Sequence, residues 1–175
     1  MNKKNSNSIM NEQELRDELK KLKHGVLGVF PSDKIPKTVS KGHALIVNTA
    51  PKGTEGQHWL SLYRDPDDGI LEIFDSFGLP LDAYPLVRKW IGNKEKYIRH
   101  NIGQLQSNNS DSCGVFCLLF LILRLKKKMT MNSFINIFDN DDLELNDCIA
   151  LYWLVKYNET DLKNFENVKS INKCI

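Results

Sequence analysis

The sequence contains no apolar segment long enough to span a membrane. Its longest apolar run extends from Val115 to Leu123, whereas a membrane-spanning helix needs about 20 residues. The N-terminus, MNKKNSNSIM, is polar and rich in asparagine, so we expect no signal peptide. These features predict a protein without a membrane contact.

A strong excess of one charge sign is also missing. The chain has 24 basic and 22 acidic residues and a net charge of +2, which is too small to indicate a nucleic-acid-binding protein by composition. Three local lysine clusters are candidates for a weak contact with DNA, although each is also typical of a solvated helix surface. They are Lys3–Lys4, Lys20–Lys21–Lys23 and Lys126–Lys127–Lys128.

Cysteine is scarce, and its spacing suggests neither a disulfide framework nor a metal site. The four cysteines are Cys113, Cys117, Cys148 and Cys174. Cys113 and Cys117 have no second cysteine pair or histidine pair nearby, so we expect no zinc site, and nothing indicates another cofactor. The pattern is typical of free thiols in a reducing, intracellular compartment.

The length and composition predict one soluble domain. A chain of 175 residues with 41% hydrophobic and 26% charged residues is long enough to bury a core of its own. We expect residues 1–10 to be disordered, residues 11–160 to form the domain, and residues 161–175 to form a C-terminal tail.

The N-terminal part of this domain predicts a helix followed by an irregular connection. From Asn11, leucines recur at helical spacing as far as Leu22, and Gly25 can end the helix. The stretch 26–41 contains Pro31 and Pro36, so we expect it to lack regular structure.

Strands are predicted in the middle of the chain and helices near its end. Residues 57–63 and 70–74 flank the turn-forming segment 64–69 and should pair as a hairpin. The almost wholly apolar stretch from Cys113 to about Leu125 predicts a buried central helix. The other predicted elements are strands at 43–48 and 97–102 and helices at 81–91, 132–138 and 143–157. This order favours an α+β domain with a central mixed or antiparallel sheet flanked by helices.

Cys113 is the first candidate for chemistry, because a polar turn at 106–112 delivers it to the first turn of the apolar helix. Free N–H groups and the positive end of the helix dipole favour a thiolate, the nucleophilic form of cysteine. Gly114 leaves space for a substrate backbone. The Cys113 backbone N–H and the Gln106 side-chain amide are candidate donors to a developing oxyanion. The alternative is that Cys113 is a small core residue, the role we assign to Cys117.

His58 is the best candidate for the base among the four histidines. It lies at the start of one predicted strand, and Asp75 follows the next strand, so the hairpin should bring them side by side. A carboxylate that accepts the ring N–H favours the imidazolium and thus the thiolate. Two alternatives remain open. Asp75 is also typical of an Asx turn. Trp59 is expected to pack in the core, to shield the ion pair through a cation–π contact, or to do both.

Taken together, these residues resemble the adenovirus-type cysteine protease family, adenain and its relatives in virophages and large DNA transposons. The resemblance covers about two thirds of the chain and does not extend beyond Leu125. The matching blocks, in family order, are Leu27–Phe30 (LGVF), Ile46–Ala50 (IVNTA), Gly56–Trp59 (GQHW), Phe74–Gly78 (FDSFG) and Gln106–Cys117.

The resemblance implies a papain-like fold whose active-site residues occur in the permuted order His, Asp, Cys. By residue matching, His58 would be the general base, Asp75 the third triad member, Cys113 the nucleophile and Gln106 an oxyanion-hole donor. It also implies an endopeptidase that cleaves virion and capsid precursor proteins near glycine-containing sites, through an acyl-thioester intermediate.

Two other functions remain as alternatives. Sentrin/SUMO-type deconjugating isopeptidases share the clan, but their glutamine usually lies one residue closer to the cysteine than the seven positions between Gln106 and Cys113. An inactive domain that binds virion proteins or DNA is the second, although it would not require Cys113, His58, Asp75 and Gln106 together.

The sequence also departs from the family in one respect. Adenain is activated by a short viral peptide through a disulfide, but the segment from Trp90 to Gln106 contains no cysteine, which argues against covalent activation. The small net charge likewise argues against DNA as an activator. We expect a monomer that needs no cofactor and that acts in the virion and inside the host cell, in a cytoplasmic virus factory or the nucleus.

Overall fold

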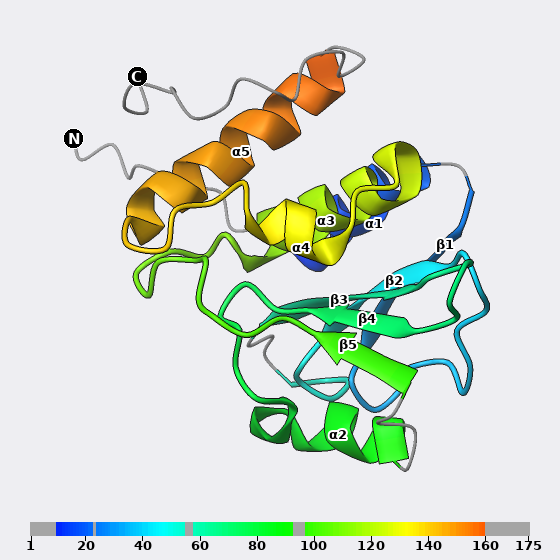
Figure 1. The fold of residues 1–175 in the computed structure, drawn as a ribbon. Helices are drawn as coiled ribbons and strands as arrows, with labels where there is room; N and C mark the ends of the chain where they lie inside the picture. The colour runs from blue at the N-terminus through cyan, green and yellow to red at the C-terminus, as the bar shows by residue number, and fades with distance from the viewer. Residues whose placement is uncertain (1–9, 23, 55–57, 93–96, 160–175) are drawn as a thin grey trace.

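A computed structural model describes residues 10–22, 24–54, 58–92 and 97–159. Its strands are β1 (Val26–Pro31), β2 (Ala44–Asn48), β3 (Trp59–Arg64), β4 (Leu71–Phe74) and β5 (Ile98–His100). Its α-helices are α1 (Glu12–Lys20), α2 (Pro85–Ile91), α3 (Cys113–Lys127), α4 (Met131–Ile135) and α5 (Leu143–Glu159), and the 3₁₀ helix η1 spans Leu81–Ala83. The predicted α+β class is confirmed: a mixed sheet is flanked by helices (Figure 1).

The five strands follow one another across the sheet in chain order. The central strands β2, β3 and β4 are antiparallel, and the outer strands β1 and β5 run parallel to their neighbours. The predicted hairpin is confirmed, with Ser61 opposite Phe74 and Arg64 opposite Leu71. This register brings the start of β3 close to the end of β4.

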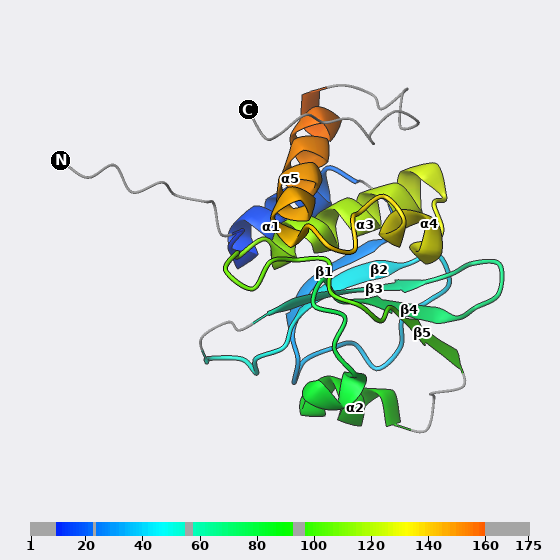
Figure 2. The same cartoon turned by 60° about the vertical axis from the view of Figure 1, so that its left-hand side comes forward.

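Each face of the sheet has its own hydrophobic core. On β2, Ala44 and Ile46 face the larger core with α1, α3, α4 and α5, whereas Leu45 and Val47 face the smaller core with α2. The alternation follows from the opposite directions of successive strand side chains. Figure 2 shows the same division, with α2 alone on the lower side of the sheet.

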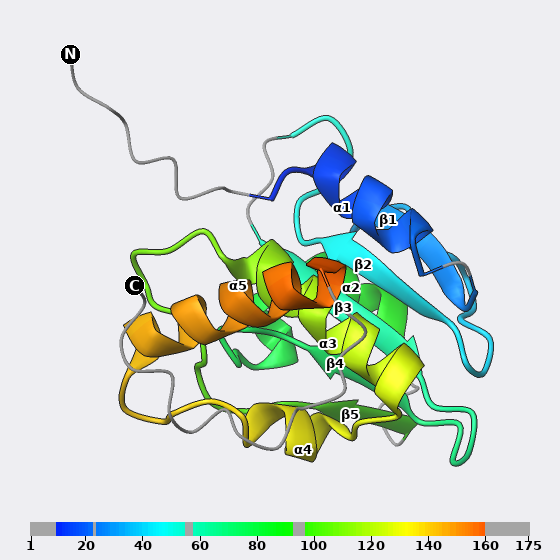
Figure 3. The ribbon, with the colours of Figure 1, turned by 90° about the horizontal axis from the view of Figure 1, so that it is seen from above.

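Helix α3 is the centre of the larger core. Every residue from Gly114 to Arg124 is buried, as expected for a helix that is apolar on all sides. It contacts β3 on one side and α5 on the other, and in the view from above α5 lies over it (Figure 3). The N-terminal end of α3, which begins at Cys113, is thereby fixed between the sheet and α5.

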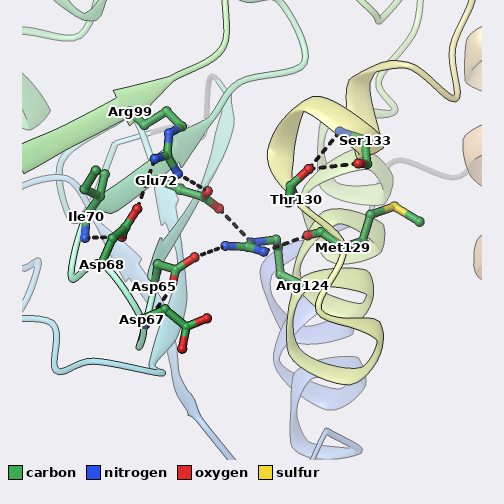
Figure 4. A network of polar contacts seen from close by, with 10 residues as sticks. All are labelled: Asp65, Asp67, Asp68, Ile70, Glu72, Arg99, Arg124, Met129, Thr130 and Ser133. Carbon is green, nitrogen blue, oxygen red and sulfur yellow. Dashed lines mark hydrogen bonds and ion pairs between the residues drawn. The ribbon is translucent and has the colours of Figure 1, made fainter.

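A buried ion-pair network fixes the other end of α3. Arg124 is 5% exposed and Glu72 on β4 is 1% exposed. Arg124 Nε lies 2.7 Å from Glu72 Oε2, and the two atoms form an ion pair that lacks the geometry of a hydrogen bond. The other two guanidinium nitrogens of Arg124 donate to Asp65 and to the Met129 carbonyl (Figure 4). Arg99 on β5 also donates to Glu72, at 2.8 Å. The network joins α3 to the hairpin.

Several sequence predictions need correction at the N-terminal side. The stretch 26–41 is not irregular throughout, because β1 occupies residues Val26–Pro31 and pairs with β2. Helix α1 ends at Lys20, five residues before the predicted stop at Gly25. Met10, predicted to be disordered, packs against the larger core. Residues 1–9 and the predicted tail at 161–175 lie outside the described residues.

Two further differences concern later segments. The single helix predicted at 81–91 is divided at Tyr84 into η1 and α2, because Pro85 occupies the first position of α2. Free thiols were expected throughout, and Cys113 and Cys117 are free, but Cys148 is disulfide-bonded. Among the described helices, none has the length and apolar character needed to cross a membrane.

Candidate active site

The β3–β4 hairpin places His58 in direct contact with Asp75. His58 immediately precedes β3, and its carbonyl accepts a hydrogen bond from Thr49 N at 2.9 Å, which continues the pairing with the end of β2. His58 Nε2 lies 2.6 Å from Asp75 Oδ1, and both side chains are buried. The pair therefore occupies the end of the sheet, as the hairpin register requires.

Asp75 is held by hydrogen bonds on both carboxylate oxygens. Besides His58, Oδ1 accepts from Phe77 N at 2.8 Å, while Oδ2 accepts from Leu79 N at 3.0 Å and from the Tyr84 hydroxyl at 2.6 Å. Burial alone would raise the pKa of Asp75, but these donors outweigh it and lower the pKa below its ordinary value. Asp75 thus forms an Asx turn and contacts His58 at the same time.

The backbone of Asp75 is fixed separately by Asn101. The Asn101 side chain accepts from Asp75 N at 2.8 Å and donates to Asp75 O at 2.6 Å. Asn101 follows β5 and is buried, so its amide extends the β4–β5 pairing past the end of both strands. This contact prevents Asp75 from rotating away from His58.

The second ring nitrogen of His58 is left for Cys113. Among the described residues, no well-formed hydrogen bond reaches the buried Nδ1. Cys113 nevertheless lies near enough to the ring to favour its protonated form. Burial favours the neutral ring, but hydrogen bonds to Asp75 and then to Cys113 outweigh it and raise the pKa of His58 to about 9. The ring is therefore protonated at neutral pH.

Two aromatic rings lie beside the His58 imidazole, and neither of them is Trp59, the ring that the sequence suggested. The centroids of His58 and Phe77 are 4.8 Å apart, and those of His58 and Tyr84 are 6.0 Å apart. Trp59 belongs to the larger core, and no ring contact joins it to His58 in the described part of the chain. Of the two roles weighed for Trp59, core packing is the one that the structure shows.

Cys113 is the first residue of α3 and is partly exposed. Cys117, one turn further along, is fully buried, and its thiol donates to Trp59 O at 3.2 Å. Burial raises the pKa of Cys117 well above its ordinary value. Of the two free cysteines, only Cys113 is therefore both accessible and next to a base.

Gln106 is buried and tied to both sides of the site. Its side-chain oxygen accepts from the Ser76 hydroxyl at 2.7 Å, and its Nε2 donates to Ser110 O at 2.7 Å. Its backbone N–H also donates to Ser76 O, at 3.1 Å. Among the described residues no hydrogen bond joins Gln106 to Cys113, and the second N–H on Nε2 has no acceptor.

Two glycines allow close packing around the site, and for Gly114 this role differs from the one that the sequence suggests. A Cβ on Gly114 would lie 2.9 Å from Met10 Cβ, so Gly114 is needed for packing of the N-terminal segment and does not open space for a substrate. Gly78 has a positive φ of 58°, and a Cβ there would lie 2.2 Å from Gly103 O. This close approach packs the turn after Asp75 against the loop that leads to Gln106.

The sequence did not reveal Tyr84, Asn101 or Phe77 as part of the site. Tyr84 and Asn101 reach Asp75 from 9 and 26 residues away along the chain, so no local spacing indicates them. The other histidines lie elsewhere: His24 is exposed, and the rings of His43 and His100 are near backbone carbonyls of their own segments.

Comparison with known proteins gives sequence relatives and no family model: none of the models matches the chain. The protein named "Protease" from Bovine adenovirus 7 is 31% identical to this chain, over 65% of the chain and 61% of its own length. The "Protease" of Snake adenovirus serotype 1 is also 31% identical, over 63% of the chain and 62% of its own length. The alignment thus spans less than two thirds of these relatives. The "Protease" of Ovine adenovirus D serotype 7 is 27% identical over 91% of the chain and 87% of its own length.

A solved structure, the central domain of the Lpg1148 protein from Legionella pneumophila, superposes with a TM-score of 0.45 and 17% identity over 86% of this chain and 98% of that one. A likeness of that size does not assign a fold family. The sequence relatives are more informative, since several independent adenovirus proteins align over most of the chain. These alignments show that the chain is related in sequence to the proteases of adenoviruses.

Proposed function

We propose that this chain is a cysteine endopeptidase of the adenovirus protease type, with Cys113 as nucleophile, His58 as general base and acid, Asp75 as the residue that orients His58, and Gln106 as an oxyanion donor. The observation that carries the proposal is the buried His58–Asp75 pair together with Cys113, a partly exposed thiol at a helix N-terminus that acts on the His58 ring.

The charge distribution favours a thiolate–imidazolium pair. The raised pKa of His58 keeps the ring protonated, and the positive end of α3 stabilises a negative sulfur. Asp75 remains ionised because its pKa is lowered. The proposed order of charges is therefore sulfur, imidazolium and carboxylate, with His58 and Asp75 buried and Cys113 partly exposed. This is the arrangement that a cysteine peptidase requires.

In the proposed reaction, the Cys113 sulfur attacks the peptide carbonyl carbon, and the C=O electron pair moves onto oxygen. When the tetrahedral adduct collapses, the C–N bond breaks and the amine leaves with the proton from His58. A water molecule then attacks the acyl-thioester as neutral His58 removes its proton, and the thiolate is released with the carboxylic acid.

The negative oxygen of each adduct needs donors that are already in place. The backbone N–H of Cys113 has no acceptor among the described residues, and Gln106 retains one N–H on Nε2. Ser76 and Ser110 fix the Gln106 amide on both sides, so its orientation is set before a substrate binds.

We propose precursor proteins of the virion as substrates, with cleavage at glycine-containing sites, because the relatives are adenovirus proteins named "Protease". The same relatives favour this class over the sentrin/SUMO-type isopeptidases. The proposal also includes a papain-like arrangement whose active-site residues occur in the order His, Asp, Cys. The proposal includes a monomer that acts in the virion and in the infected cell without a cofactor. A weak DNA contact through the lysine clusters is also part of the proposal, although in one cluster Lys20 and Lys21 already pair with Asp17 and Glu18.

The decisive experiment is co-expression of the chain with capsid precursor proteins, followed by sequencing of the product ends. We expect cleavage by the wild type and none by Cys113→Ala. Cys117→Ala is the matched control, because Cys117 lies on the same helix but is buried away from the base, and it should still cleave. Processing by Cys113→Ala would contradict the assignment of the nucleophile, and a preference for modifier conjugates over capsid peptides would favour the isopeptidase.

A further inference from the structure

One carboxylate on α5 contacts both ends of the loop that connects Gln106 to Cys113. Asp147 Oδ2 accepts from Ser107 N, the residue after Gln106, at 3.3 Å. Asp147 Oδ1 accepts from the hydroxyl of Ser112, the residue before Cys113. Helix α5 lies beyond the sequence blocks on which the resemblance to the protease family was based, and the proposed reaction does not use Asp147.

The contact changes the role of Ser112 at the start of α3. Serine before the first helical residue normally caps the helix with its hydroxyl, but Ser112 has φ −85° and ψ 5° and makes no such bond. Its hydroxyl is held by Asp147 and lies 2.9 Å from the Ser110 hydroxyl. Ser112 therefore leaves the N–H groups that a serine cap normally binds without a side-chain acceptor. Among the described residues, the backbone N–H of Cys113, the first residue of the helix, also has no acceptor.

Other residues of α5 support the same loop. Glu144 Oε1 accepts from the Ser107 hydroxyl at 3.2 Å, and the buried Asn146 donates to Leu105 O at 3.1 Å. Burial raises the pKa of Asp147 even though three serines donate to it or lie close by. Asp147 is thus a partly buried carboxylate that binds both ends of one loop. This arrangement indicates that it fixes the conformation of that loop.

We propose that Asp147 is a positioning residue for acyl transfer: by clamping Ser107 and Ser112, it sets the distance between the Gln106 amide and the Cys113 backbone N–H, the two oxyanion donors. This inference rests on the proposed function. It assigns to α5 the task of keeping these donors apart and correctly aimed, at the point where the negative oxygen forms.

The test separates oxyanion stabilisation from thiolate formation. The substrate is a fluorogenic glycine-containing peptide that the wild-type protein cleaves. Its hydrolysis requires both the thiolate and a stabilised oxyanion. Alkylation of Cys113 by iodoacetamide requires the thiolate but forms no oxyanion. We expect Asp147→Ala to lower kcat for the peptide by about 10- to 100-fold, as for a displacement of about 1 Å, with KM and the alkylation rate within about twofold of the wild type.

Three further variants complete the design. Asp147→Asn keeps an acceptor for Ser112 but presents N–H groups to Ser107, so its loss should be intermediate. Ser112→Ala removes one clamped hydroxyl and should lower kcat in the same way, which keeps the test valid if Asp147→Ala does not fold. Asp141→Ala is the control, since Asp141 is exposed near the start of α5 and makes no hydrogen bond or ion pair with the described residues of the loop.

The outcomes distinguish this inference from the proposed function. If the wild type hydrolyses the peptide and the Asp147 and Ser112 variants match it, Asp147 has no positioning role. If alkylation falls in parallel with hydrolysis, Asp147 supports the thiolate or the general fold, and the inference is also wrong. If the wild type neither hydrolyses peptides nor shows selective alkylation of Cys113, the proposed function itself fails and this inference with it.

Discussion

Asp75 combines two tasks that the sequence presented as alternatives. One of its oxygens binds His58 and closes the Asx turn, and the other accepts from Leu79 N and Tyr84. A buried carboxylate is stable only when most of its hydrogen-bond positions are filled. The neighbours of Asp75 therefore decide both the stability of the site and the orientation of His58.

Replacement of Tyr84 tests this dependence. Tyr84→Phe keeps the ring near His58 but removes the hydroxyl from Asp75, so one position of a buried carboxylate is left unfilled. We expect a loss of about 1–3 kcal/mol in the free energy of unfolding, measured by urea denaturation. Tyr152→Phe is the control, because Tyr152 lies exposed on α5, and it should change stability by less than about 0.5 kcal/mol. Equal effects of the two variants would contradict the proposed importance of the hydroxyl.

The contact between Gly78 and Gly103 gives a second prediction for single residues. Gly78→Ala adds a methyl group where the Gly103 backbone already lies, and it also places a side chain at positive φ. We expect a loss of roughly 2–5 kcal/mol from the two effects together. Gly42→Ala has a positive φ of 75° but open space around the new Cβ, so it should cost only about 1–2 kcal/mol. Thermal denaturation of both variants measures the difference, and similar midpoints would show that the close approach has little effect.

Among the elements, those with a clear hydrophobic period were predictable from the sequence. Helix α3 begins at the predicted residue because apolar side chains cover all its faces after a polar turn, and the hairpin of β3 and β4 follows from the turn-forming residues between two short apolar runs. Strand β1 was missed, because Gly28 and Pro31 disfavour strands in general. Both are tolerated here: β1 is an edge strand with a register shift beside Gly28.

Contacts between elements were the part that the sequence did not reveal. The hairpin predicted that His58 and Asp75 are neighbours, because their positions depend only on local pairing. Tyr84 and Asp147 depend on how α2 and α5 pack against the sheet and α3, and no repeat or spacing encodes that packing. The residues that support the site, unlike those proposed for its chemistry, became visible only in three dimensions.

The ion-pair network at the far end of α3 predicts how strongly that helix is attached. Arg124→Met would leave Glu72 buried next to Arg99 alone, and we expect a loss of about 3–5 kcal/mol. In the double variant Arg124→Met with Glu72→Leu the buried charge is gone, so most of the stability should return. Urea denaturation of the wild type and both variants gives the comparison. If the double variant is less stable than Arg124→Met, the unpaired charge of Glu72 is not the cause of the loss in the single variant. The prediction would then be wrong.

For the whole molecule, the proposed site joins segments that are distant in the chain. His58 and Asp75 come from the sheet, Gln106 from a loop, Cys113 from the central helix, and Asp147 from the helix that covers it. The stability of the domain and the geometry of the site are therefore linked, and the charge state of the buried His58–Asp75 pair should affect both.

The dependence of stability on pH follows from the two pKa changes. The pKa of His58 is raised from 6.5 to about 9 in the folded protein, so protonated His58 stabilises the fold fully below about pH 6.5, and this contribution disappears as the pH rises through about 9. The lowered pKa of Asp75 adds stability above about pH 4 that is lost in more acidic solution.

The measurement is the free energy of unfolding of the wild type and of His58→Gln between pH 4 and 10, because other titrating groups cancel in the difference. That difference should be largest from about pH 4 to 6.5 and should shrink by an amount on the order of 3 kcal/mol by about pH 9 to 10. Peptide hydrolysis should decline over the same alkaline range, as the imidazolium that protonates the leaving amine is lost. Parallel stability curves would mean that His58 is not held as an imidazolium, and the charge arrangement proposed for Cys113 would then lack its central member.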